Sequence, residues 1–230
     1  MTAADLYESP LFGVAITCLA YGLWTLAQRR WRWAHALLGT CGTIIAFLLI
    51  AKVPVASYQN GGKLVSFFLG PATVALGVPF YTQAKRIRRH LPAIGVAVLA
   101  GSITGMATAG LVAWWLHASN PVLRAMIPKS VTTPISMEVA RQLGGSPELA
   151  AVFTVIAGLI GSLIGPWLLR LVGVRNEIAR GAGIGTSSHG IGTARLLRDS
   201  DLAGGVSGFS MALAGVITSL LAIPLHHWLS

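Results

Sequence analysis

The chain has 230 residues, of which 54% are hydrophobic and 10% charged, and its formal net charge is +10. A soluble domain usually carries about 25% charged residues, so this composition excludes an ordinary water-soluble protein. The basic residues lie in short clusters between long apolar runs, which is typical of cytoplasmic loops and disfavours nucleic-acid binding. The runs lack the alternation of barrel strands. We therefore predict an all-α polytopic membrane protein.

Apolar runs alternate with polar stretches along the chain, and about 20 apolar residues suffice to span a bilayer. The runs that we expect to form helices are 10–26, 34–53, 64–82, 91–117, 149–172 and 204–228. Two other stretches, 120–145 and 179–197, are too polar to face lipid, and the sequence leaves open whether they span or re-enter. We expect about seven or eight transmembrane or re-entrant helices, several interrupted, in a single transmembrane domain over residues 1–230.

Charge asymmetry predicts an orientation in the plasma (inner) membrane. The basic clusters 29–32 and 85–89 follow the first and third runs and share one side if the spans alternate. The positive-inside rule places them in the cytoplasm and the N-terminus outside. Residues 1–9 hold no basic residue, so we expect a retained helix rather than a signal peptide. Cys18 and Cys41 lie in apolar runs without metal-ligand spacing, and we expect neither metal nor cofactor.

A weak internal repeat is present. The interrupted stretch 70–79 precedes a Gly-rich helix at 101–110, and the stretch 130–134 precedes another at 158–165. Interrupted segments paired in two halves indicate a transporter site near the membrane midplane, often in an inverted repeat. The alternative is that membrane helices are simply rich in glycine, proline and threonine.

The first candidate stretch contains two prolines in an apolar run. A proline removes one backbone donor and clashes with the carbonyl one turn earlier, so the freed groups can line a cavity. We predict helix breaks at Gly70, Pro71 and Pro79, with the Thr73 hydroxyl as a substrate ligand. A kinked helix without any ligand explains the same pattern.

The second candidate stretch, 128–138, surrounds Pro134 with hydroxyl and charged side chains. We predict a helix break at Pro134. A threonine before Pro134 is a natural N-cap, and the helix that begins there offers free N–H groups to an anion. The residues that we assign to substrate binding are Lys129, Ser130, Thr132 and Thr133. Glu138 is a candidate for proton coupling, because acidic residues at membrane depth are usually functional. The alternatives are a snorkelling Lys129 and a Glu138–Arg141 pair.

The third candidate stretch, 179–195, combines glycines with hydroxyl residues. We assign Ser187, Ser188 and Arg195 to substrate binding, and His189 to proton coupling because it can titrate near neutral pH. A histidine that only bonds a neighbouring helix is the alternative. Neighbouring side chains such as Ser188 and His189 point apart on a helix, which disfavours a hydrolase, and we predict no enzymatic activity.

The stretches 70–79, 129–138 and 179–195 together resemble the signatures of the LrgB/CidB family in order and spacing, over essentially the whole chain. The resemblance implies an antiholin-like membrane protein that acts with a holin-like LrgA/CidA partner and controls murein hydrolase export and autolysis. It also implies a relation to plastid glycolate/glycerate translocators and to bacterial pyruvate movement.

Two functions are therefore open. The first is a transporter of small monocarboxylates (pyruvate, lactate or glycolate), acting with a holin-like LrgA/CidA partner. The second is a regulator of such a partner without transport of its own. Hydroxyl-lined, interrupted helices with ionisable residues favour the transporter, because packing alone does not require them. The lipid bilayer is the other partner, and a homo-oligomer is compatible with the sequence.

Overall fold

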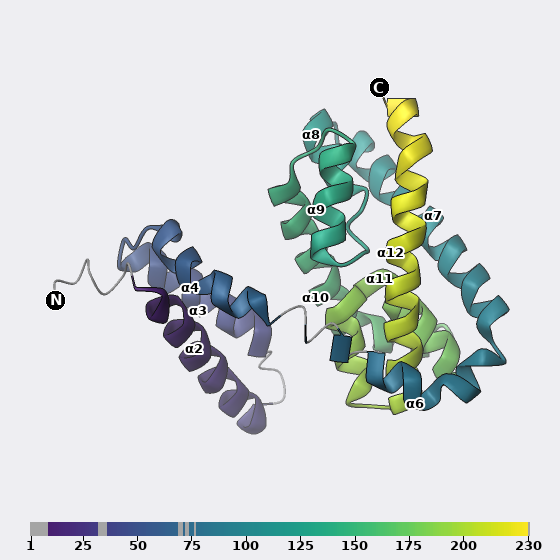
Figure 1. The fold of residues 1–230 in the computed structure, drawn as a ribbon, viewed down its shortest axis with the longest axis horizontal. Helices are drawn as coiled ribbons and strands as arrows, with labels where there is room; N and C mark the ends of the chain where they lie inside the picture. The colour runs from purple at the N-terminus through teal and green to yellow at the C-terminus, as the bar shows by residue number, and fades with distance from the viewer. Residues whose placement is uncertain (1–8, 32–35, 69–70, 72–73, 76, 230) are drawn as a thin grey trace. The chain divides into compact units, whose positions relative to one another are not determined.

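The computed structural model describes residues 9–31, 36–68, 71, 74–75 and 77–229. These residues form helices and no strand, in two compact units, 1–73 and 74–230 (Figure 1). Among the helices of the described ranges, four are long and apolar enough to cross a membrane: α2 (Pro10–Arg30), α7 (Leu91–Trp115), α10 (Pro147–Leu171) and α12 (Asp201–Leu229). The prediction of an all-α polytopic membrane protein is confirmed.

The first unit packs α2 against α3 (Ala36–Ile50) and α4 (Val55–Phe67). The helices α2 and α4 approach closely at two glycines, because a Cβ on Gly13 would lie 2.6 Å from the Tyr58 carbonyl oxygen and 2.9 Å from Gly61 Cα. The Thr17 Oγ1 and Tyr58 Oη atoms share a hydrogen bond of 3.0 Å beside this contact. The buried apolar side chains of this unit are Ala20, Ile44, Leu48 and Val53.

The apolar run 64–82 is not one continuous helix, because α4 ends at Phe67 and Phe68 lies in a turn. The next described helix with defined bounds is α6 (Gly77–Arg88). At 1.5 Å per residue, their 13 and 12 residues extend only about 20 and 18 Å, less than the roughly 30 Å of hydrocarbon. Their composition gives the reason: α4 contains two amides and a lysine, and the last turn of α6 holds three basic residues.

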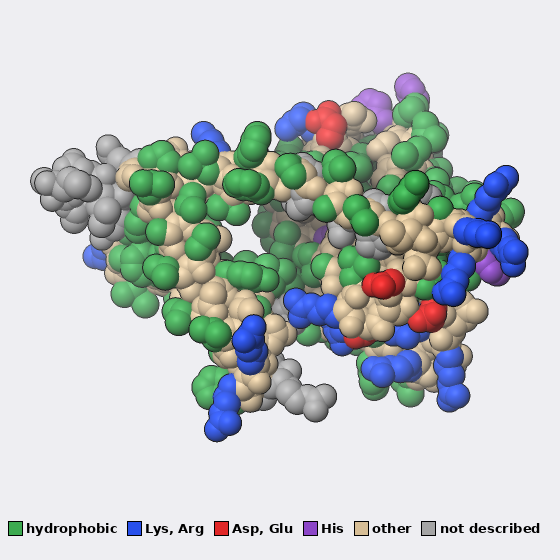
Figure 2. Space-filling model, turned by 60° about the horizontal axis from the view of Figure 1, so that its bottom comes forward, with side chains coloured by type: hydrophobic (Ala, Val, Ile, Leu, Met, Phe, Trp, Pro, Cys, Tyr) green, Lys and Arg blue, Asp and Glu red, His purple; other side chains and the backbone are tan. Residues whose placement is uncertain are grey.

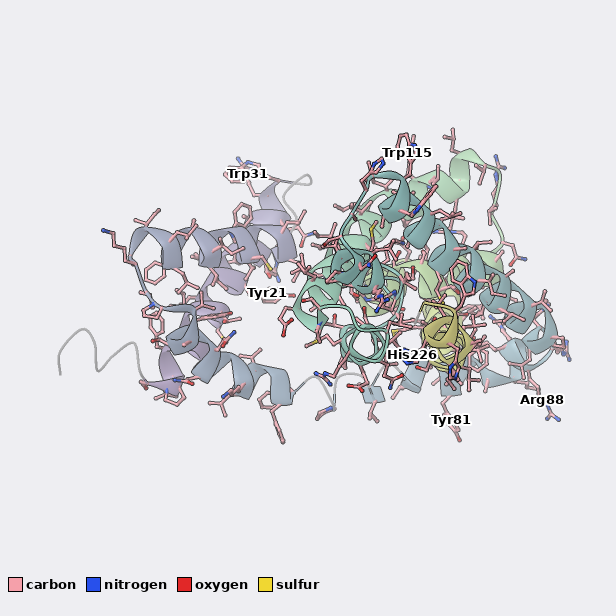
Figure 3. All side chains as sticks on the ribbon, turned by 90° about the horizontal axis from the view of Figure 1, so that it is seen from above. Tyr21, Trp31, Tyr81, Arg88, Trp115 and His226 are labelled. Carbon is pink, nitrogen blue, oxygen red and sulfur yellow. The ribbon has the colours of Figure 1, made fainter. Side chains whose placement is uncertain are left out.

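The short helix α6 has one apolar contact face and an outer face that is exposed. Its Ile87 is fully buried in a cluster with Ile94 of α7 and Val206 of α12. Tyr81 is 82% exposed, and Figure 3 shows the Tyr81 and Arg88 side chains pointing away from the helices. An exposed tyrosine and a basic last turn are typical of a helix that lies at a membrane surface.

In the second unit, two polar stretches form helical hairpins between the long helices. The first hairpin consists of α8 (Asn120–Met126) and α9 (Thr133–Gln142), joined by residues 127–132. These helices have 7 and 10 residues, so they extend about 10 and 15 Å and cannot cross a bilayer. Thr132 occupies the N-cap position of α9, one residue earlier than the threonine directly before Pro134 that the sequence predicts, and Pro134 lies in the first turn.

The second hairpin is α11 (Glu177–Leu197), which reverses direction at His189. His189 has φ 41° and ψ −136°, which is not helical. A Cβ on Gly192 would lie 2.6 Å from Ile184 Cγ2, although residues eight apart in a straight helix are separated by about 12 Å. The chain therefore folds back on itself at His189.

The two hairpins lie at opposite ends of the second unit. At one end, α6 and the beginnings of α7, α11 and α12 share a core cluster, and α6 and α11 lie in the lower part of Figure 1. At the other end, the first hairpin packs against α7 and the last turns of α12, in the upper part of the same view. We call the first of these the basic end, because most arginines and lysines of this unit lie there: Lys85, Arg86, Arg88, Arg89, Arg170, Arg175, Arg180, Arg195 and Arg198.

Candidate binding pocket

A pocket of about 500 Å³ lies between α7, α11 and the residues that join α8 to α9. It contains side chains from both hairpins, which are about fifty residues apart in the sequence. The lining residues are Ala97, Gly101, Thr104, Gly105, Thr108, Lys129, Ser130, Ala179, Ala182, Gly183, Thr186 and Ser187. We call this the binding pocket.

Two glycines of α7 bring the hairpins to the pocket. A Cβ on Gly101 would lie 3.0 Å from Thr186 Cγ2, and one on Gly105 would lie 3.4 Å from Ser130 Oγ. Gly101 and Gly105 are one helical turn apart, so the two hairpins meet α7 about 6 Å from one another. Larger residues here would push Thr186 and Ser130 away from the pocket.

Lys129 supplies the positive charge of the binding pocket. Its Nζ lies 3.5 Å from Ser130 Oγ, and the residue is half-buried. No ion pair involves Lys129 in the part of the chain that the structure describes, and none of the described lining residues is acidic. A lysine without an acidic partner in a partly enclosed site is arranged to receive an anion from outside.

The hydroxyl groups of the pocket are held by their own helices. Thr104 and Thr108 donate to carbonyl oxygens one turn earlier, at 2.8 and 2.7 Å, and Thr186 and Ser187 do the same at 2.7 and 2.8 Å. A hydroxyl hydrogen rotates to suit its partner, so each group can exchange this bond for one to a bound ligand. The pocket therefore combines one charge with several exchangeable donors.

A buried polar network fixes the hairpins behind the pocket. The His189 Nε2 atom lies 2.9 Å from the Thr154 carbonyl oxygen in α10. The Thr154 hydroxyl donates to Ser136 Oγ in α9 at 2.8 Å, so α10 links both hairpins. Thr193 Oγ1 and Ser207 Oγ share a 2.8 Å bond that ties the second hairpin to α12. All five residues are buried, where an unpaired polar group would be costly.

Among the residues predicted to bind substrate, Lys129, Ser130 and Ser187 line the pocket. The others with described positions lie outside its lining. Thr132 and Thr133 are at the start of α9 and half-buried, so the pocket does not use the N-terminus of that helix. Ser188 is fully buried against α10, where Gly161 leaves room for it.

Arg195 lies at the end of α11 and forms an exposed ion pair with Asp199, with 2.7 Å between Nη1 and Oδ1. Glu138 is exposed and pairs with Arg141, which is the alternative that the sequence left open for it. His189 is buried and, through its bond to Thr154, matches the alternative of a histidine that holds a neighbouring helix.

Two predicted positions of the first candidate stretch, Gly70 and Thr73, lie outside the described residues. Pro71 is exposed. Pro79 lies within α6. Sequence reasoning missed Thr104, Thr108 and Thr186, although the last belongs to the third candidate stretch.

Comparison with known proteins places the chain in one family. Residues 17–228, which include helices of both units, match the model of the LrgB-like family. The chain is 38% identical to the uncharacterized protein YwbG of Bacillus subtilis over 91% of this chain and 93% of that protein. It is 29% identical to the antiholin-like protein LrgB of the same organism over 94% of both chains. No solved structure matches it. The chain belongs to the LrgB-like family.

Proposed function

We propose that this protein transports small monocarboxylates of the pyruvate, lactate or glycolate type, with Lys129 as the binding charge. The observation that carries the proposal is the binding pocket, which joins one lysine to hydroxyl groups from three segments. A carboxylate needs a positive charge and hydrogen-bond donors, and these residues offer both. The pocket lies where two interrupted elements meet, as substrate sites of transporters do.

The electrostatic contribution of Lys129 to carboxylate binding determines how large an effect its substitution should have. Two unit charges 4 Å apart attract by about 4 kcal/mol at an effective dielectric constant of about 20. Lys129 is only half-buried, so solvent screens part of this energy. Losing even about 1.4 kcal/mol weakens binding tenfold. We therefore expect Lys129→Gln to raise the KM for a carboxylate by tenfold or more.

Uptake of labelled pyruvate and glycolate into liposomes containing the purified protein tests this proposal. Lys85→Gln is the matched control, because Lys85 is an exposed lysine of α6 outside the pocket. The proposal requires uptake by the wild type and by Lys85→Gln, with a strong loss in Lys129→Gln. Equal KM values for all three proteins would remove Lys129 from the site.

Proton coupling through Glu138 or His189 is part of the same proposal. A coupled carrier takes up more substrate when a pH gradient is imposed, and the coupling residue is needed for this dependence. Uptake with and without a gradient is measured for Glu138→Gln and His189→Gln. If the gradient dependence survives both substitutions, the coupling proton binds elsewhere.

The second candidate function is antiholin-like regulation, with a holin-like LrgA/CidA protein as partner. The name of the Bacillus subtilis relative, antiholin-like protein LrgB, favours this second function. Its test is co-purification with a holin-like protein of the LrgA/CidA type, together with liposomes that show no uptake. If the protein is instead a carrier that needs this partner, it would also co-purify with the holin-like protein. Liposomes containing both proteins would then take up the substrate.

We also propose that the protein lies in the plasma (inner) membrane with its N-terminus outside and the basic end in the cytoplasm. Figure 2 brings the basic end toward the viewer and shows blue Lys and Arg side chains gathered on it, with few acidic ones. The acidic residues of these segments are Glu177, Asp199 and Asp201. Such an excess of positive charge is what the positive-inside rule expects of a cytoplasmic face.

A further inference from the structure

We propose that the binding pocket opens to the basic end through a passage between α7 and α11 and is closed toward the opposite end. The identity of the transported ion rests on the proposed function, but the passage itself does not. Its evidence is a second hollow, of about 250 Å³, which we call the mouth. The residues that line the mouth are His90, Ala93, Ile94, Ala97, Asn176, Ile178, Ala179 and Ala182.

The mouth and the binding pocket share three lining residues, Ala97, Ala179 and Ala182. Two hollows bounded by the same three small side chains are neighbours along the groove between the same two helices. Ala97 belongs to α7, and the other two belong to α11. The passage therefore runs from the helix beginnings at the basic end to Lys129.

Small side chains keep the passage open. On α7, Ala93, Ala97 and Gly101 follow one another at intervals of four residues and so lie on one face of the helix. On α11, Ala179 and Gly183 have the same spacing. Leucine or phenylalanine at such positions would fill the space between the two helices, as happens in an ordinary helix contact.

Positive charge lies beside the mouth. The start of α11 itself offers no free donors there from Ile178 and Ala179, because their N–H groups donate to Asn176 Oδ1 at 2.8 and 3.2 Å. Exposed arginines stand next to the mouth residues in the chain, Arg89 before His90 and Arg175 before Asn176. Positive charge around an opening raises the local concentration of anions there.

Toward the opposite end, apolar packing closes the pocket. The side chain of Ile127 lies against α7, with its Cγ1 3.6 Å from the position of a Cβ on Gly110. Ile127 is buried in a cluster with Met106 and Leu143, and Leu221 and Leu225 of α12 pack against this cluster. Met106, Ile127, Leu221 and Leu225 also line a separate hollow of about 850 Å³ toward the opposite end. This hollow shares no lining residue with the binding pocket, and its lining is apolar apart from Asn120 and Arg124, so it offers an anion little to bind. We therefore infer that an anion reaches the binding pocket from the basic end.

Cysteine labelling tests the passage. In a background with Cys18→Ala and Cys41→Ala, Ala97→Cys and Ala179→Cys place one thiol on each wall. A membrane-impermeant methanethiosulfonate is added from one side of the membrane at a time. The control is Val96→Cys, because Val96 is 68% exposed beside Ala97 on α7 but lines neither hollow.

Two exposed positions identify the sides without assuming an orientation: Arg175→Cys marks the basic end, and Glu148→Cys, at the start of α10, marks the opposite end. We expect both wall cysteines to react at least tenfold faster from the Arg175 side, and at least tenfold faster than Val96→Cys. Reaction from the Glu148 side, or reactivity equal to that of Val96→Cys in both folded wall variants, would overturn the passage. If labelling follows the expectation but pyruvate does not slow it, the passage stands and the carboxylate proposal loses its support.

Discussion

Replacing Gly161 with alanine should destabilise the second unit, although alanine is the better helix former. Gly161 lies in α10, opposite Ser188 at the turn of the second hairpin. A Cβ on Gly161 would lie 2.8 Å from Ser188 Cβ, and Ser188 is fully buried. Because the backbone fixes the position of Ser188 Cβ, side-chain rotation cannot relieve this contact. The hairpin turn must move away from α10.

The opposing contributions give the size of the effect. Alanine in place of a helical glycine gains about 0.5–1 kcal/mol through backbone entropy. Overpacking a filled site costs about 1–3 kcal/mol. A displaced turn also weakens the bond between His189 and Thr154, of a kind worth about 0.6 kcal/mol in membrane proteins. The net loss is about 0.6–3 kcal/mol, which lowers the Tm of a chain of this size by about 1–12 °C.

Thermal unfolding of the detergent-purified protein measures this loss. Gly95→Ala in α7 is the matched control, because a Cβ on Gly95 meets nothing within 4 Å. The Tm of Gly95→Ala should therefore equal that of the wild type or exceed it by a few degrees. If Gly161→Ala and Gly95→Ala have the same Tm, the turn of the second hairpin is not packed on α10 as the structure shows.

Three further substitutions separate packing from binding. Thr154→Val removes the hydrogen bond to Ser136 Oγ and should lower the Tm by a few degrees, since such bonds are worth about 0.6 kcal/mol on average in membrane proteins. Arg195→Gln should leave uptake kinetics unchanged and shift the Tm by less than about 3 °C, because an exposed ion pair contributes about 0–1 kcal/mol. Thr104→Val should leave the Tm nearly unchanged and raise the KM for pyruvate several-fold in liposome uptake, because its exposed hydroxyl faces the pocket.

The long membrane helices could be predicted closely from the sequence. The expected runs 91–117 and 149–172 correspond to α7 and α10 within two residues at each end, because a long apolar run is a local property. The helix α4 was missed, since it is polar enough to resemble a loop. Its Gly61 serves the close approach to α2, which only the folded chain reveals.

The residues of the candidate site could be predicted where a polar side chain is conspicuous in its local sequence. Lys129 and its neighbour Ser130 stand out as polar residues in an apolar chain, and they line the pocket. Thr104 and Thr108 give no such signal, because threonines that bond their own helix are common in membrane spans. Arg195 lies outside the pocket lining and pairs with Asp199 four residues later, a local pair that the sequence prediction overlooked.

The contacts of the hairpins define a repeating element that differs from the one suggested by the sequence. Each hairpin packs on glycines of the long helix that precedes it, so the repeating element is a long helix followed by a hairpin. The pairs are Ser130 with Gly105 and Ile127 with Gly110 in the first element, and Ser188 with Gly161 and Ile184 with Gly165 in the second. Each hairpin also reaches the other long helix, through Thr186 at Gly101 and Ser136 at Thr154.

These equivalent contacts differ in one respect that bears on transport. On the α7 side, the contacts at Gly101 and Gly105 are less close than those at Gly158 and Gly161 on the α10 side, and the binding pocket lies beside them. On the α10 side, the side chains of Ser188 and His189 fill the space over Gly161 and Gly158, and Ser136 bonds to Thr154. The contact region at α7 therefore leaves space for a pocket, and the equivalent contact region at α10 is filled. A carrier could use this difference: if the region at α7 closed and the region at α10 opened, access to the site would change from one face of the membrane to the other.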